Sequence, residues 1–284
     1  MPMNLETIQT ILLIIYIVLT MFLMGLRLTW SHIRLLSEHR SLLGRTLLVN
    51  ILIVPAVAVI LVLIIALPKD FAIGLFLIAA APGAPFAPKF AERVKGPFPV
   101  AVAMMFVLVV VSLITIPATV TLILLQKREA IIVFSALFFM LILVQTIPLL
   151  LGIAINSHWE KISGRVQKPL TAAANLLAVV VIVLVIVTNW GKFSEVDWRM
   201  LAAVIILLLA SLLFGWLLGG PALLTRRVLA FVTSARNVAV ALLVAETIFP
   251  RTDADIGIMV FAVAMLIADI ALAAYWKQST LEPT

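Results

Sequence analysis

Nine long apolar runs constrain the fold of this chain of 284 residues more than any other feature. Each run holds 19 to 28 residues, and a short polar cluster separates it from the next. An α-helix rises about 1.5 Å per residue, so every run is long enough to cross the roughly 30 Å hydrocarbon core of a bilayer. We therefore expect an all-α polytopic membrane protein with about nine transmembrane helices. The expected spans are 8–26, 46–67, 71–94, 98–125, 131–155, 170–190, 199–219, 226–249 and 255–276.

The composition agrees with a membrane protein and excludes a water-soluble domain. Hydrophobic residues make up 64% of the chain, charged residues 12%, and the mean hydropathy is +1.27. A soluble domain of this composition would expose large apolar patches and aggregate. The longest polar stretch, 156–169, has only the length of a loop, so residues 1–284 are expected to form a single transmembrane domain. Positive charge follows the run 8–26 instead of preceding it, which favours a retained helix over a signal peptide.

The positive charges predict how the chain is oriented in the membrane. With the amino terminus outside, the inner segments hold twelve cations and the outer segments six. Cytoplasmic loops carry the excess of Lys and Arg, so we expect the carboxyl terminus to lie in the cytoplasm. The expected location of the protein is the cell (inner) membrane. The net charge of +7 then reflects topology and contact with the lipid bilayer, and requires no nucleic acid. The inner cations are Arg27, Arg34, Arg40, Arg45, Arg93, Lys95, Lys161, Arg165, Lys168, Arg226, Arg227 and Lys277, and the outer ones Lys69, Lys127, Arg128, Lys192, Arg199 and Arg251.

Residue types that carry metal or catalytic chemistry are sparse. The chain has no cysteine, and its three histidines, His32, His39 and His158, show no metal-ligand spacing. The sequence shows no nucleophile elbow, phosphate-binding loop or paired carboxylates. We therefore expect neither an enzyme, nor a metal site, nor a cofactor.

The span 71–94 contains a sequence that an intact helix does not accommodate. Its segment "AAAPGAPFAPKFAERVKG" includes Pro82, Gly83, Pro85 and Pro88. Proline removes an amide donor and clashes with the preceding turn, so a helix breaks where several prolines follow one another. The sequence predicts that this transmembrane helix is interrupted.

The span 226–249 places polar side chains at the depth where lipid-facing residues are apolar. Its segment "VTSARN" brings Thr233, Ser234, Arg236 and Asn237 together. Insertion scales assign a cost of about 2.5–3.5 kcal/mol to an arginine at the bilayer centre, so Arg236 is expected to face the protein interior. One alternative is purely structural, a salt bridge between Arg236 and the other intramembrane charge, Asp269.

The two unusual spans are expected to face each other inside the bundle. Non-helical backbone at bilayer depth is tolerated where protein or a water-filled cavity satisfies it. Broken helices at matching positions in two halves are typical of transporters with inverted repeats, whose substrate site lies at the break. We expect repeat halves at about 8–125 and 170–276, with the broken helix third in each half, joined by the helix 131–155.

Several segments resemble the bile acid:sodium symporter family. "MGLRLTW" resembles the family's segment at the end of a helix, "LLVNILIVP" its polar residue five positions before a proline, and "AIGLFLIAAAPGAP" its Pro-Gly-Gly crossover. "TSARNVAVALLVAETIFP" is similar to the family's second crossover, and "AAYW" also recurs. The resemblance covers roughly residues 20–277. It implies a core of crossing broken helices plus a panel, alternating access, a small organic anion such as a bile acid or keto acid as substrate, and nine of the family's ten helices.

The chain departs from this family at the residues that bind sodium. Ala87 and Pro88 stand where the family has Ser-Asn, Val232 where it has a glutamate, and Arg236 where it has a glutamine. A hard cation requires about six oxygen ligands. Oxygen ligands remain in register only at Asn50 and Asn237. The sodium sites are therefore expected to be largely absent.

Our hypothesis is that two fixed cations, Lys89 and Arg236, take the electrostatic role of the two sodium ions. Arginine offers a planar fork that suits a carboxylate, and lysine loses its proton more readily when desolvated. Lys89 lies nearer the inner end of its span, so an alternative is that its long side chain reaches the lipid headgroups. If transport is coupled to protons, Asp269 is the carboxylate that we expect to carry the proton.

The remaining polar residues of the spans receive more local assignments. Asn50 is expected to face the crossover, or else to form an ordinary hydrogen bond between helices. Ser234 and Asn237 are expected to cap the second half of the broken helix. Gln145 and Thr146 either line a cavity or bond neighbouring backbone, and the sequence favours neither.

The leading functional interpretation is a secondary transporter of a small organic anion. An alternative of another class is a membrane sensor or assembly subunit that keeps the transporter fold without transport. The sequence leaves open which anion is carried, whether it is imported or exported, and the oligomeric state.

Overall fold

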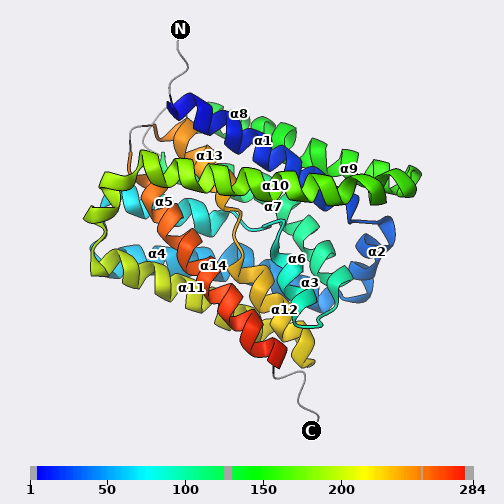
Figure 1. Cartoon of the computed structure of the whole chain (residues 1–284). Helices are drawn as coiled ribbons and strands as arrows, with labels where there is room; N and C mark the ends of the chain where they lie inside the picture. Colours follow the sequence, from blue (N-terminus) through cyan, green and yellow to red (C-terminus); the bar gives the residue numbers. More distant parts are fainter. Residues whose placement is uncertain (1–4, 125–129, 251, 279–284) are drawn as a thin grey trace.

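A computed structural model describes residues 5–124, 130–250 and 252–278, almost all of them in helices (Figure 1). The α-helices are α1 (Leu5–Leu26), α2 (Trp30–Glu38), α3 (Arg40–Leu47), α4 (Val54–Ile64), α5 (Lys69–Ala80), α6 (Ala87–Arg93), α7 (Phe98–Ile123), α8 (Ala130–Leu141), α9 (Ile147–His158), α10 (Glu160–Thr188), α11 (Trp198–Leu218), α12 (Leu223–Ser234), α13 (Val238–Ile248) and α14 (Ala254–Gln278). Two π-helical segments, η1 (Leu48–Ile53) and η2 (Ile142–Thr146), connect α3 to α4 and α8 to α9, and a 3₁₀ segment, η3 (Trp190–Glu195), follows α10. Lys127, Arg128 and Arg251, assigned above to the outer side, lie outside the described residues.

The helix lengths confirm the prediction of an all-α polytopic membrane protein. Within the described part of the chain, seven helices are long and apolar enough to cross a membrane. The two predicted spans that are not among them, 71–94 and 226–249, are interrupted, as expected from their sequences. The first is divided into α5 and α6, and the second into α12 and α13, each too short to cross the bilayer alone. The seven are Thr7–Leu26, Arg40–Ile64, Phe98–Ile123, Ala130–His158, Glu160–Thr188, Trp198–Leu218 and Ala254–Gln278.

The helices form two groups, with the interrupted helices in one of them. In the first group, which we call the panel, α1 packs against α9 and α10, and α8 continues into α9 through η2. In Figure 1 these helices lie along the upper side of the molecule. The second group, the core, contains α3 to α7 and α11 to α14, with α4 and α11 along the lower side. The panel and the core meet where α8 packs against α7 and where α1 contacts α13.

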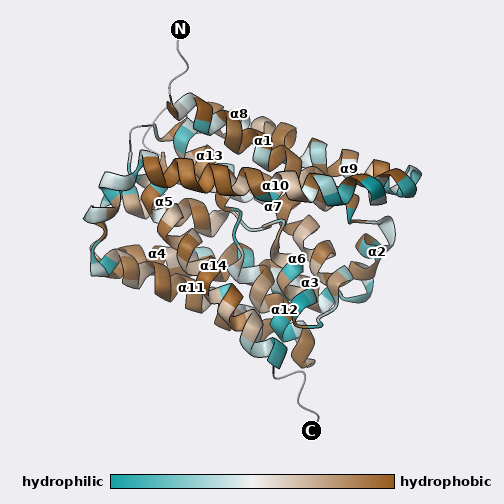
Figure 2. Cartoon of the chain, in the orientation of Figure 1, coloured by the Kyte–Doolittle hydropathy of each residue, from teal (hydrophilic) through white to brown (hydrophobic). Residues whose placement is uncertain are grey.

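Apolar side chains cover most of the helical surface. Figure 2 shows the helices as predominantly hydrophobic along their lengths, with hydrophilic residues gathered near the ends of several helices. Large apolar side chains such as Leu63, Ile64 and Ile131 are among the most exposed residues of the chain. A surface of this kind is stable only against lipid, because contact with water would leave a continuous apolar patch.

Glycines allow the closest approaches between helices. Gly25 of α1 and Gly152 of α9 face each other so closely that a Cβ atom at Gly152 would overlap the carbonyl oxygen of Phe22. Gly74 of α5 and Gly257 of α14 form a similar contact in the core. Small residues let transmembrane helices gain van der Waals contact where the hydrophobic effect does not drive association.

We expect Gly152→Ala to destabilise the panel, because the added methyl group must push α1 and α9 apart. Overpacking of this kind costs about 1–3 kcal/mol, which corresponds to a fall of several degrees in the unfolding midpoint. Fluorescence-detected thermal unfolding of the purified protein measures the shift. The matched control is Gly164→Ala in α10, where the added atom meets nothing within 4 Å. An equal midpoint for both variants would contradict the close contact.

Candidate functional site

The two interruptions meet in the interior of the core. Pro82, in the break between α5 and α6, forms an isolated antiparallel β-bridge with Arg236, in the break between α12 and α13. The backbone amide of Asn237 donates a hydrogen bond of 2.8 Å to the carbonyl oxygen of Ala81. Figure 1 shows the two non-helical connections running through the middle of the molecule. We call this region the crossover and define it as residues 81–86 and 235–237.

The carbonyl groups released at the end of α5 are satisfied one after another. The carbonyl oxygen of Ala79 accepts a hydrogen bond of 3.2 Å from Nη1 of Arg236. That of Ala80 accepts one of 2.9 Å from the hydroxyl of Thr115 on α7, and that of Ala81 accepts the amide of Asn237. A helix end buried in an apolar medium needs such partners, because an unpaired carbonyl costs several kcal/mol there. The second break therefore supplies two of the three groups that stabilise the first.

Arg236 is the largest fully buried side chain of the described residues. Its exposed fraction is 0%, so the prediction that it avoids lipid is confirmed. Its backbone amide donates to the sulfur of Met265 on α14, at 3.3 Å. Within the described chain, Nε and Nη2 of the guanidinium have no hydrogen-bond partner. A positive charge with free donors is thus held at the carboxyl end of α5, where the helix dipole is negative.

Asp269 lies close to the second break, but it does not form an ion pair with Arg236. Its carboxylate is fully buried and accepts a hydrogen bond of 2.8 Å from the hydroxyl of Ser234, while Oδ2 has no partner among the described residues. Neither Asp269 nor Arg236 takes part in an ion pair among the described residues. The alternative of a structural salt bridge to Arg236 is therefore not supported. The prediction that Ser234 caps the second half-helix is wrong, since Ser234 is the last residue of α12 and binds Asp269.

Two buried amides reach the second break from neighbouring helices. Asn50 donates from Nδ2 to the carbonyl oxygen of Thr46 and, at 3.4 Å, to the hydroxyl of Thr233. Asn237 caps α13 as predicted, because its side chain accepts from the amide of Val240, and it donates from Nδ2 to Oε1 of Gln145 at 3.1 Å. Asn50 is buried, and its bond to Thr233 joins two helices, so both alternatives given for it agree with the structure. Gln145 lies on the panel, so its bond to Asn237 joins the panel to the crossover.

The side-chain amides of Asn50 and Gln145 both lie in π-helical segments that precede a proline. Asn50 lies in η1 ahead of Pro55, and Gln145 in η2 ahead of Pro148. A proline lacks the amide that would close the preceding turn, and π-bulges widen a helix locally, often at functional sites. The wider turn changes the direction of the side chains within it. A polar residue three to five positions before a proline was therefore the only sequence signal for Gln145.

The glycine and prolines of the first break have separate positions. Gly83 has φ of +95°, which favours glycine, and a Cβ atom there would lie 2.9 Å from the backbone nitrogen of Val109. Pro82 pairs with Arg236, and Pro88 lies at the start of α6, where the missing amide leaves no bond unmade. Pro85 lies in the turn before α6 and lines a cleft next to α1.

Lys89 is not brought to the buried junction of the two breaks. Its side chain is exposed on α6 and lines a cleft between the core and the panel, together with Arg27, the residue that follows α1. The structure thus separates the two cations that the sequence hypothesis had placed together, with Arg236 inside the core and Lys89 at its boundary. Arg27 had been assigned only to membrane topology, because it is the first charge after a transmembrane run.

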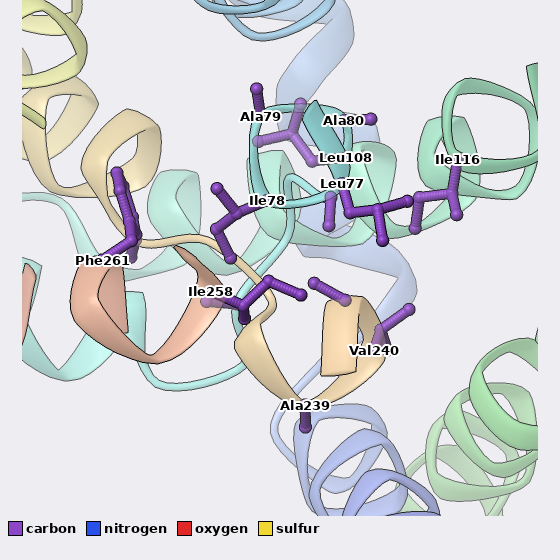
Figure 3. Close-up of a cluster of buried hydrophobic side chains, with 14 of the residues drawn as sticks. Leu77, Ile78, Ala79, Ala80, Leu108, Ile116, Ala239, Val240, Ile258 and Phe261 are labelled. Atoms are coloured by element: carbon purple, nitrogen blue, oxygen red, sulfur yellow. The ribbon is translucent and has the colours of Figure 1, made fainter. Parts of the chain in front are cut away.

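An apolar shell surrounds the crossover. Figure 3 shows a cluster of buried apolar side chains from the helices next to it, including Ile78 of α5, Leu108 of α7, Val240 of α13 and Ile258 of α14. Electrostatic interactions are stronger in such an environment than in water. The charge of Arg236 therefore acts over a longer range here than an exposed arginine would.

Comparisons with known proteins assign the chain to a family through roughly its first two-thirds. A family model described as Sodium Bile acid symporter family matches residues 14–196. The matched range includes the first break, most of α1 and the other three panel helices, and ends before α11. A comparison with curated proteins finds no match.

We expect Ser234→Ala to lower thermal stability, because it removes the one hydrogen bond found for the buried Asp269 carboxylate. Leaving a buried acceptor unpaired costs about 1–3 kcal/mol, or several degrees in the unfolding midpoint. Ser211→Ala is the matched control, since the hydroxyl of Ser211 is buried but bonds only a carbonyl of its own helix. Asp269→Asn should preserve stability, because an amide oxygen accepts the same bond. Equal effects of the two serine variants would contradict the assignment.

Proposed function

The chain belongs to the sodium bile acid symporter family, and we propose that it carries a small organic anion by alternating access with a fixed arginine in place of a bound sodium ion. The family consists of sodium-coupled, bile acid-type transporters, so the chain is a multi-pass membrane protein of a transport family and not of an enzyme family. The observation that carries the proposal is the buried guanidinium of Arg236 at the crossover.

The location of this guanidinium supports its role as a substitute for an ion. The carboxyl end of a helix carries a partial negative charge of roughly half an elementary charge, which attracts cations. Nη1 of Arg236 binds the carbonyl oxygen of Ala79 at this end of α5. A cation that is part of the chain neutralises the helix end permanently, whereas a sodium ion does so only while it is bound.

The positions corresponding to the family's sodium ligands support the same proposal. Ala87 and Val232 are fully buried and apolar, and Pro88 is buried at the start of α6. None of these side chains offers an oxygen atom, although a hard cation needs about six oxygen ligands. We therefore propose that sodium is not the coupling ion, and that Asp269 is the group that carries a proton if transport is driven by one.

The packing of the core supports an inverted repeat of residues 8–125 and 170–276. In such a repeat, α4, α5, α6 and α7 correspond to α11, α12, α13 and α14. Two contacts within each half match: α4 packs on α5 as α11 packs on α12, and α6 on α7 as α13 on α14. Contacts between the halves match as well, since α5 packs on α14 and α12 on α7. Helix 131–155, which comprises α8, η2 and most of α9, joins the two halves.

Alternating access is proposed to move the core against the panel. The hydrogen bond between Asn237 and Gln145 crosses from one group to the other at the crossover. A relative movement of the two groups has to break this bond, so it would hold one of the two access states. We propose that the amino terminus is outside and the carboxyl terminus cytoplasmic, in keeping with the opposite ends of the molecule at which α1 begins and α14 ends (Figure 1).

We expect uptake of labelled organic anions into proteoliposomes to continue at an undiminished rate when choline replaces sodium at constant pH. The physical reason is that Arg236 supplies the charge that sodium supplies elsewhere. Labelled 2-oxoglutarate and taurocholate serve as probes, and protein-free liposomes as the control. Strict dependence on sodium would overturn the proposal, and binding of a probe without flux would favour a sensor that retains the fold.

We expect Arg236→Gln to reduce uptake by at least about tenfold, because it removes the charge and leaves the end of α5 without its cation. Arg236→Lys keeps the charge and should retain part of the activity. Size-exclusion chromatography and thermal unfolding show whether each variant is folded. A folded Arg236→Gln variant with the uptake rate of the unmodified protein would reduce this arginine to a packing residue.

A further inference from the structure

A small cleft lies between the panel and the core, next to the crossover. Its walls come from α1, from α10 and from the segment that leads from the first break into α6. The volume of the cleft is about 70 Å³. Because both groups of helices line it, a ligand bound there would contact the two parts that alternating access moves.

Two positively charged side chains line this cleft. Arg27 directly follows the last residue of α1, and Lys89 belongs to α6. They lie close enough for Arg27 to act electrostatically on Lys89. Neither takes part in an ion pair among the described residues, and the lining of the cleft contains no Asp or Glu. The two charges therefore repel each other without a carboxylate between them.

Polar donors accompany the cations. Nη2 of Arg27 donates to the hydroxyl of Thr171 on α10 at 3.1 Å, which fixes the guanidinium against the panel. The remaining donors of a guanidinium form a planar fork, which suits a carboxylate. Tyr16 and Asn175 also line the cleft, and their side chains carry further hydrogen-bond donors.

The charge and the size of the cleft together limit its ligand. Two cations without a counter-charge are balanced by an anion with two negative charges, and the gain is large in a partly desolvated site. A volume of 70 Å³ is far below the roughly 300–1,000 Å³ of pockets that enclose drug-sized ligands. A steroid would have to separate the panel from the core to enter, whereas a short acid requires little opening.

Resting on the proposed transport function, we propose that this cleft binds a compact dicarboxylate between Arg27 and Lys89. Arg27 holds one carboxylate in its fork, and Lys89 pairs with the other as a point charge. The proposal assigns to Arg27 a binding role in addition to its contribution to topology. It also assigns Lys89 to the substrate, while Arg236 remains the fixed cation of the crossover.

The experiment compares two acids of equal length and different charge, glutarate and valerate. Both are titrated as choline salts by calorimetry into the full chain in phosphatidylcholine nanodiscs, so that sodium and anionic lipid are absent. We expect glutarate to bind at least about tenfold more tightly than valerate, since the second carboxylate forms a further charge-assisted bond. Equal affinities, or tighter binding of taurocholate than of glutarate, would overturn the proposal.

The variants Arg27→Gln and Lys89→Gln should each reduce the ratio of the two affinities to about one, because the single remaining cation pairs with only one carboxylate of either acid. Arg165→Gln is the matched control, because Arg165 is an exposed cation on α10 that does not line the cleft. A glutarate preference that survives both cleft variants would contradict the proposal. A general loss of stability would lower the affinity for both acids, and thermal unfolding of each variant detects it.

A lipid phosphate offers chemistry similar to that of a carboxylate, and a further arm separates the two sources. Adding phosphatidylglycerol to the nanodiscs should leave the glutarate affinity within about twofold of its value in phosphatidylcholine alone. Competition between phosphatidylglycerol and glutarate that depends on Arg27 and Lys89 would show that the site holds a lipid headgroup. These binding measurements do not depend on whether the protein transports the acid. Glutarate binding through these residues without flux would refute only the proposed transport, and flux indifferent to both variants would refute only the cleft.

Discussion

The mutual satisfaction of two broken backbones is the constraint on which the rest of the structure depends. The crossover lies within an apolar shell, where the carbonyl groups at the end of α5 have no access to bulk water. The amide of Asn237 and the guanidinium of Arg236 supply two of their partners, and both belong to the other break. Neither interruption is therefore stable alone. This dependence fixes α13 against α5, and the remaining core helices pack around that junction.

The fixed charge of Arg236 links the fold to the proposed transport. A guanidinium at the end of α5 does structurally what a bound cation would do, because it binds the carbonyl oxygen of Ala79 where the helix dipole is negative. An ion in that position leaves and returns during a transport cycle, but a side chain does not. We infer that the driving force enters elsewhere, and the buried Asp269, bonded to Ser234 at the end of α12, is the titratable group next to the junction.

The sequence predicted the helix breaks, which depend on neighbouring residues in the chain. It did not predict the features that depend on the direction in which a side chain points. The breaks were found because clustered prolines and a mid-span arginine conflict with a continuous lipid-facing helix. Ser234 was assigned to the wrong helix end, because sequence alone did not show whether the break begins before or after it. The inward direction of Gln145 depends on a π-helical turn, which a period of 3.6 residues does not reproduce. Arg27 was interpreted as a topology charge, because its neighbours in the cleft come from distant parts of the chain.

The most direct test is a cryo-electron microscopy map of the protein in nanodiscs with sodium present, at a resolution that shows side chains and ions. The account predicts that density for the Arg236 guanidinium reaches the carbonyl oxygen of Ala79, that the two broken segments lie in contact, and that no ion density lies between them. A guanidinium directed at lipid, an uninterrupted helix through residues 81–86, or an ion coordinated at the crossover would contradict it.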